Sequence, residues 1–211
     1  MKLYSYFRSS ASYRVRIALN IKNLPYEIVP VHLVKGEQKS DDYKAKNPSG
    51  LIPALELENG KVITQSMAIL DYLENEYPAI PLLPKDNVNR AIVLSMCNII
   101  ACDTHPLNNL RVLKYLTGEL NISDEQKQDW YAHWILVNFT ALEELLKVHS
   151  GQYSFGDEIT WADICLIPQV YNANRFKVDL TNFPNILKVV ENCQTLEAFI
   201  IASPEKQVDF E

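Results

Sequence analysis

The chain has 211 residues, 47% of them hydrophobic and 22% charged, which is enough to bury one large core or two smaller ones. The formal net charge of −6 at pH 7 excludes a general nucleic-acid or anionic-membrane surface, so an anionic ligand has to be bound by a local site. The first residues contain no apolar segment typical of a signal peptide, and no stretch reaches the roughly 20 apolar residues of a membrane helix. We therefore expect a cytoplasmic protein that binds neither nucleic acid nor membrane.

Residues 2–7 alternate and are rich in aromatic side chains, which predicts a strand. An amphipathic helix is expected from Ser12 onward, and it should end before the next proline, whose predecessor is disfavoured in helical conformation. Residues 26–33 again indicate a strand, and Pro30 within it favours the edge of a sheet because proline cannot donate to a ladder. The charged segment 34–49 is expected to form an exposed loop or a short helix.

Two short apolar stretches, 51–57 and 61–66, flank Asn59-Gly60, which is a strong hairpin signal. A helix follows directly, and Ser66 is expected to act as its N-terminal cap. The order of elements in this part of the chain is therefore βαβ, then a β-hairpin, then α.

Prolines at 78, 81 and 84 indicate a stiff linker, after which the apolar residues recur only at helical spacing. Helices are predicted within 86–120, 123–149, 161–176 and 183–202. Thr160 and Asp163 have the spacing of a capping box, so this pair is interpreted as a folding element and not as part of a catalytic site. The sequence thus predicts an α/β domain at 1–80 and an all-helical domain at 85–211.

The four cysteines, at 97, 102, 165 and 193, lie in apolar helical contexts and include no CxxC pair. Buried, reduced thiols are therefore expected at all four positions, and no metal site is predicted.

Three serines crowd the turn after the first strand: Ser9, Ser10 and Ser12, next to Arg8. A helix N-terminus has unpaired N–H donors and favours negative charge, so a single serine is enough to cap it. Three serines exceed that requirement. On the residues alone, the turn is either an ordinary cap or a site for an anion, and both interpretations stay open.

Two further features fit a peptide-like ligand. The Ile52-Pro53 bond is a candidate cis peptide, which would expose the backbone groups of Ile52 to an extended peptide. Gln65-Ser66 lies at a strand-to-helix turn, where a second helix N-terminus can hold a carboxylate.

Five stretches carry a family resemblance: YSYFRSSASYRVRIAL, NPSGLIPAL, ITQSMAILDYLE, DTHPLNNLRVLKYL and YSFGDEITWADICLIPQVYNANRFKVDLTNFP. They resemble the zeta class of cytosolic glutathione transferases, and within it the maleylacetoacetate isomerases, over about residues 2–200. The resemblance implies an N-terminal thioredoxin-like domain followed by an all-helical glutathione transferase C-terminal domain. It also implies a homodimer with glutathione as cofactor.

The resemblance further implies catalytic roles for Ser9 and Ser10, with Ser9 donating a hydrogen bond to the glutathione sulfur. The implied glutathione-binding residues are Ser9, Ser10, Ala11, Ser12, Tyr13, Arg14, Ile52, Pro53, Gln65, Ser66, His105, Asn109, Leu110 and Arg111. From the residues alone, however, Arg14 and Arg16 lie inside a helix and are expected to be structural. Tyr4 and Tyr6 are alternative sulfur partners, which the serine turn disfavours. Ala11 stands where many relatives have a cysteine, which weakens a disulfide-forming interpretation.

The implied reaction is the cis–trans isomerisation of maleylacetoacetate to fumarylacetoacetate, a step of tyrosine catabolism, by reversible addition of the thiolate. The substrate is a dianionic enedioyl acid, and Arg8, Arg111 and Arg175 are the candidate ligands because a guanidinium group suits a carboxylate. Alternative functions are maleylpyruvate isomerisation, a general glutathione transferase or haloacid-transforming activity, and a non-catalytic interaction module.

Overall fold

The computed structural model describes all residues 1–211 and divides into two compact units. One unit consists of Met1–Pro81 together with Gln194–Glu211, and the other is Leu82–Cys193. The first boundary lies close to the change in composition. Residues 194–211 differ from the sequence interpretation, which assigns them to the helical domain. They pack with the first unit, where Phe199 and Ala202 are buried and the carbonyl of Ala202 accepts a hydrogen bond from Arg16.

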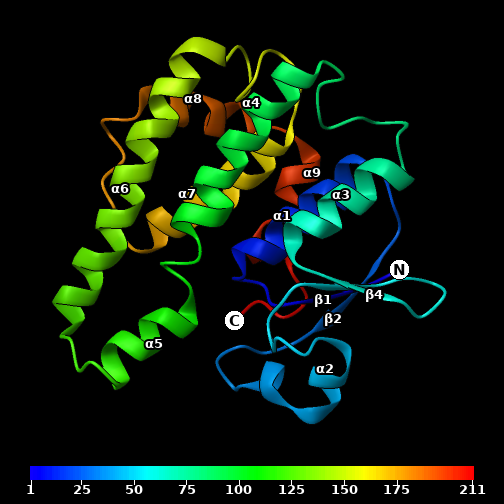
Figure 1. Ribbon diagram of the computed structural model, residues 1–211, viewed down its shortest axis with the longest axis vertical. Coiled ribbons are helices and arrows are strands. Elements are labelled where there is room, and N and C mark those ends of the chain that lie inside the picture. The colour runs from blue at the N-terminus through cyan, green and yellow to red at the C-terminus, as the bar shows by residue number, and fades with distance from the viewer. The chain divides into compact units, whose positions relative to one another are not determined.

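A four-stranded sheet of order β2-β1-β3-β4 forms the centre of the first unit (Figure 1). The strands are β1 (Lys2–Ser5), β2 (Glu27–Pro30), β3 (Ala54–Glu56) and β4 (Val62–Thr64). β1 pairs in parallel with β2, while the β1–β3 and β3–β4 pairs are antiparallel. The edge position predicted from Pro30 is confirmed, and so is the hairpin, in which Gly60 adopts a φ of 80°.

Three longer helices accompany this sheet: α1 (Ser10–Ile21), α2 (Asp41–Lys46) and α3 (Ser66–Glu76). Figure 1 shows α1 and α3 together on one side of the sheet and α2 on the other. A 3₁₀ turn at Glu37–Lys39 precedes α2, as expected for the charged segment. The C-terminal residues add α9 (Glu197–Ile200), which packs against α1, and a 3₁₀ turn at Pro204–Lys206.

The second unit is helical. Its helices are α4 (Asn87–Asn98), a π-helical segment (Ile99–Thr104), α5 (Leu110–Gly118), α6 (Asp124–His149), α7 (Trp161–Arg175) and α8 (Pro184–Cys193). The helix predicted within 86–120 is therefore interrupted, because its path widens to a π-helix and then breaks before α5. No helix of the chain is both long and apolar enough to cross a membrane.

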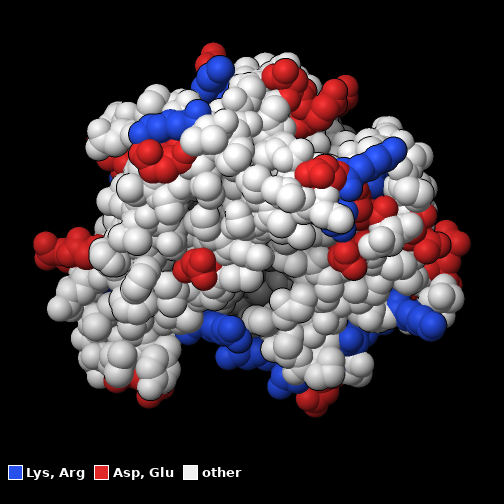
Figure 2. Space-filling model, turned by 45° about the horizontal axis from the view of Figure 1, so that its top comes forward, with Lys and Arg blue, Asp and Glu red and all other residues white.

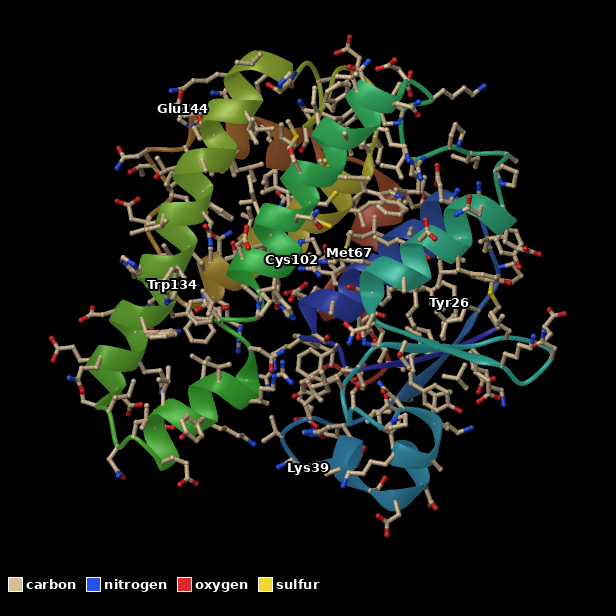
Figure 3. All side chains as sticks on the ribbon, in the orientation of Figure 1. Tyr26, Lys39, Met67, Cys102, Trp134 and Glu144 are labelled. Carbon is tan, nitrogen blue, oxygen red and sulfur yellow. The ribbon has the colours of Figure 1, made fainter.

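The capping box at the start of α7 is confirmed. Asp163 is fully buried and accepts hydrogen bonds from the backbone N–H groups of Ser154 (2.7 Å) and Thr160 (2.8 Å). Among the cysteines, those at 97, 165 and 193 are buried as expected. The prediction is wrong for Cys102, which is exposed in the π-helical segment and is labelled in Figure 3.

Candidate functional site

The turn between β1 and α1 is organised by Ser9. Its backbone N–H donates to the carbonyl of Tyr6 (2.9 Å), and its Oγ accepts the N–H of Ser12 (3.2 Å) as the N-terminal cap of α1. Capping uses only the acceptor capacity of a hydroxyl group, which also carries one O–H donor. No hydrogen bond within the chain uses that proton. The capping and anion-binding interpretations are therefore compatible, since one serine can serve both.

The residues that follow Ser9 in the first turn of α1 are buried, and their hydrogen bonding differs. Ser10 and Ala11 are buried in the first turn of α1, and the fully buried Oγ of Ser12 has no hydrogen-bond partner. Tyr13 has a structural contact, because its hydroxyl donates to the carbonyl of Phe199 (3.4 Å).

Tyr4 of β1 and Tyr6, which directly follows this strand, both have hydroxyl groups that are already hydrogen-bonded. The hydroxyl of Tyr4 donates to Glu56 (2.7 Å), and that of Tyr6 accepts from Nη2 of Arg8 (2.8 Å). The guanidinium of Arg8 also lies 4.9 Å from the ring centre of Phe7. These contacts hold Arg8, one of the three candidate carboxylate ligands, directly beside Ser9.

A cis peptide bond joins Ile52 and Pro53, as the sequence predicts. The carbonyl of Leu51, just before it, accepts hydrogen bonds from the Tyr43 hydroxyl (2.7 Å) and from Asn47 Nδ2 (2.6 Å). By contrast, none of the backbone hydrogen bonds of the chain engages Ile52, which lies just outside β3. Its N–H and C=O are therefore available to an extended ligand.

The N-terminus of α3 has no side-chain cap. The cap position is Gln65, which adopts a left-handed φ of 71° and makes no capping hydrogen bond. The prediction that Ser66 caps this helix is wrong, since Ser66 is already its first helical residue. Met67, labelled in Figure 3, belongs to the same first turn. An uncapped helix start leaves N–H donors that suit an anion, and backbone strain of this kind is common at functional sites.

Arg14 links α1 to the N-terminus of α3. It is 1% exposed, and its Nη1 donates to Ser66 Oγ at 3.3 Å. Its Nε and Nη2 are buried without any partner, and no carboxylate pairs with it. A buried cation in this state is costly, and an anionic ligand would relieve that cost. The structure thus shows an unsatisfied positive charge at the uncapped start of α3.

Arg16, by contrast, is satisfied. Although it is also fully buried, its three nitrogens donate to Ala202 O, Ser5 Oγ and Phe7 O at 2.9–3.1 Å. Burial lowers the pKa of Arg16 to about 10. The structural interpretation of the helix arginines therefore holds for Arg16 and does not account for Arg14.

The remaining candidate residues belong to the second unit. His105 follows the π-helical segment, Asn109 caps α5 by accepting the N–H of Arg111 (3.1 Å), and Leu110 is the first residue of α5. Arg111 is exposed.

Arg175 ends α7, is also exposed, and lies 4.6 Å from the ring centre of Phe176. Within this unit, Tyr131 of α6 contacts both the segment before α5 and the residue that follows α7. Its carbonyl accepts from Asn108 (3.0 Å), and its ring stacks on Phe176 (3.6 Å). Burial raises the pKa of Tyr131, and the Arg175 guanidinium opposes that shift. The sequence interpretation missed this aromatic platform, because Tyr131 follows the ordinary apolar spacing of a helix.

Figure 2 shows both acidic and basic side chains on the face drawn, with uncharged residues covering most of it. No group of three or more His, Cys, Asp or Glu residues is suited to hold a metal ion.

Comparisons with known proteins agree with this architecture. Residues 1–75 match the family model described as the glutathione S-transferase N-terminal domain, and residues 110–199 match that of the C-terminal domain. The chain is 46% identical over 209 residues to a probable maleylacetoacetate isomerase of Vibrio cholerae serotype O1, covering 98% of this chain and 97% of the relative.

Two solved structures extend the comparison. A holo maleylpyruvate isomerase, described as a bacterial glutathione S-transferase of the zeta class, is 46% identical with a TM-score of 0.97 and full coverage of both chains. The maleylacetoacetate isomerase of Methylobacterium extorquens AM1, with bound malonate and glutathione, is 36% identical with a TM-score of 0.95, and 98% of each chain is covered. The chain therefore belongs to the glutathione S-transferase family and, within it, to the zeta class.

Proposed function

We propose that this protein is a glutathione-dependent isomerase that converts maleylacetoacetate to fumarylacetoacetate. The observation that carries the proposal is Ser9, whose hydroxyl caps α1 and still has an O–H group to donate at the positive end of that helix. The Vibrio cholerae relative carries the same activity in its name, and the Methylobacterium extorquens relative binds glutathione together with a small dicarboxylate.

The residues of the first unit fit glutathione at three points. The γ-glutamyl carboxylate suits the open N-terminus of α3 at Gln65 and Ser66, where the unpaired nitrogens of Arg14 add a positive charge. The peptide backbone suits the unengaged N–H and C=O of Ile52. The sulfur suits the hydroxyl of Ser9. These complementary groups support glutathione over a ligand that has only a carboxylate or only a thiol.

Bound glutathione supplies a thiolate, whose reversible addition to the double bond of a cis-enedioyl acid permits rotation to the trans isomer. The chain's contribution is to keep the thiol ionised. A helix N-terminus contributes about 0.3–2 kcal/mol to a nearby anion, and a hydrogen bond to a charged group about 1.5–3 kcal/mol. At about 1.36 kcal/mol per pKa unit, α1 and Ser9 together lower a thiol pKa of about 8.5 by roughly one to four units.

The carboxylates of the substrate require cationic partners. Tyr6 and Phe7 hold the guanidinium of Arg8 by their contacts, and its place next to Ser9 in the chain supports Arg8 as one such partner. We further propose Arg111 and Arg175, both exposed, as partners contributed by the second unit, with His105 and Asn109 near the ligand. Maleylpyruvate is the second candidate substrate, because the holo maleylpyruvate isomerase is as similar to this chain as the maleylacetoacetate relative. A cytoplasmic homodimer is the proposed working form.

The decisive experiment follows the ultraviolet loss of maleylacetoacetate and of maleylpyruvate with and without glutathione. We expect rapid conversion only with glutathione, and equal rates without it would refute the cofactor role. Dichloroacetate and a chloronitrobenzene, assayed in parallel, test the general transferase alternative.

Ser9→Ala provides the residue-level test, with Ser40→Ala as matched control, because Ser40 caps α2 in the same way by accepting the N–H of Tyr43 (3.3 Å). Loss of a preorganised donor lowers kcat by roughly 100-fold. We therefore expect that loss in Ser9→Ala and an unchanged kcat in Ser40→Ala. Equal effects of the two substitutions would reduce Ser9 to a cap.

A further inference from the structure

The turn that carries Ser9 is held at its centre by two side chains of opposite charge. Phe7 lies inside the turn closed by the hydrogen bond between Ser9 N–H and Tyr6 C=O. Its own N–H donates to Oδ2 of Asp209 (3.0 Å), and its C=O accepts from Nη2 of Arg16 (3.1 Å). Both polar groups of this one residue are therefore fixed from outside the turn.

The C-terminal residues of the chain provide this support. Figure 1 shows the C-terminus beside the strands of the first unit. Arg16 is fixed there as well, because its Nε donates to the carbonyl of Ala202 (2.9 Å). The ring of Phe210 contacts that of Phe7 edge to face, with centroids 5.5 Å apart at 86°. The guanidinium of Arg8 lies over the same Phe7 ring at 4.9 Å. The contacts of Phe7 thus join the C-terminal residues to both groups proposed for the chemistry, Ser9 and Arg8.

We propose that Asp209 is a positioning residue for the thiol site: its carboxylate fixes the Phe7 peptide and thereby the direction of the Ser9 hydroxyl. This inference rests on the proposed glutathione site. Asp209 has two effects on the pKa of a bound thiol, and these have opposite directions. A titration therefore shows which effect dominates. As a negative charge near the site, Asp209 disfavours the thiolate. As a fixed acceptor for the Phe7 N–H, it keeps Ser9 oriented and favours the thiolate.

The experiment titrates the thiol of glutathione bound to the purified protein, using the ultraviolet absorbance of the thiolate. The variants are Asp209→Ala, Asp209→Asn and Asp209→Glu, with Glu205→Gln as matched control. Glu205 is an exposed carboxylate of the same segment that also acts on Arg16 by its charge, and it makes no hydrogen bond to the turn.

We expect the bound thiol pKa to rise by about 0.5–1 unit in Asp209→Ala, a fraction of the one to two units that a hydrogen bond to a charged group represents. The rise should be smaller in Asp209→Asn, whose amide oxygen can still accept from Phe7, and smallest in Asp209→Glu. In Glu205→Gln the pKa should stay unchanged or fall. The ratio kcat/KM for the isomerisation should follow the thiol pKa across the series.

The results separate the inference from the proposed function. If glutathione bound to the unsubstituted protein titrates like free glutathione, the proposed thiol site itself is wrong. If it titrates low but Asp209→Ala leaves the pKa unchanged or lowers it, Asp209 acts only as a charge or as a structural group, and the inference fails. A melting curve of each variant verifies that it folds. Should Asp209→Ala not fold, the other two variants decide: the thiol pKa should rise more in Asp209→Asn than in Asp209→Glu, and no rise in either contradicts the inference.

Discussion

Replacing Arg14 by methionine removes one charge while keeping a side chain of similar length inside the same helix. In the unliganded protein this charge is 1% exposed, has a single hydrogen bond to Ser66, and leaves Nε and Nη2 unpaired. Because such a cation is poorly compensated, we expect Arg14→Met to unfold at the same temperature as the original protein or higher. The benefit of Arg14 should instead appear on binding.

The magnitude follows from the contact that a carboxylate would make. A hydrogen bond to a charged group is worth about 1.5–3 kcal/mol, which corresponds to a loss of about 10- to 150-fold in affinity for glutathione. The charge needs geometry as well as sign, since an ammonium group cannot offer the fork of a guanidinium. The affinity of Arg14→Lys for glutathione should therefore lie between that of the original protein and that of Arg14→Met.

The assay is calorimetric titration with glutathione and with cysteinylglycine, which lacks the γ-glutamyl carboxylate. The original protein and Arg14→Met are each titrated with both ligands, which gives a double-mutant-type cycle. The substitution should lower the affinity for glutathione strongly and leave the affinity for the dipeptide almost unchanged. Equal losses for both ligands would show that Arg14 does not meet the carboxylate. A melting temperature of unliganded Arg14→Met several degrees below that of the original protein would make Arg14 a structural residue instead.

Two further predictions concern stability. Asp163→Ala leaves two buried N–H groups without an acceptor, one of them that of Thr160, and should lower the free energy of unfolding in urea by about 2–5 kcal/mol; a change below about 1 kcal/mol would contradict the capping-box role. Hydrogen bonds from Lys46 and Tyr4 hold the pKa of Glu56 below its usual 4.5. This stabilisation is therefore present above pH 4.5 and is lost as pH falls through the lower folded-state pKa, so Glu56→Gln should flatten the decline of urea stability from about pH 6 to pH 3. An unchanged decline would exclude Glu56 as a contributor.

Local signals predicted much of the first unit correctly. The Asn59-Gly60 turn, the edge position of Pro30 and the cis Ile52-Pro53 bond each depend on a few adjacent residues. The same holds for the Thr160–Asp163 capping box. The helix N-terminus at the serine turn is confirmed as well, whereas the anion interpretation of that turn stays a prediction.

The errors have a common physical origin in packing. Ser66 has the chemistry of a cap, yet the strand-to-helix turn places the cap position one residue earlier, at Gln65. Cys102 has apolar neighbours in sequence, but the π-helical widening turns it outward. The unpaired state of Arg14 depends on which groups surround it in space and has no signature in sequence. The support of Phe7 by Asp209 spans 202 positions, so no local pattern could indicate it.

The separation of 202 positions between Phe7 and Asp209 also determines when during synthesis the serine turn gains its full set of contacts. A chain leaves the ribosome from its N-terminus, and domains generally fold as their residues emerge. The serine turn appears with the first residues, whereas Ala202, Asp209 and Phe210 follow the whole helical unit. Contacts that close such a long loop form slowly and late. The thioredoxin-like unit is consequently unfinished during most of synthesis, and its serine turn is tightened only when Asp209 and Phe210 reach Phe7.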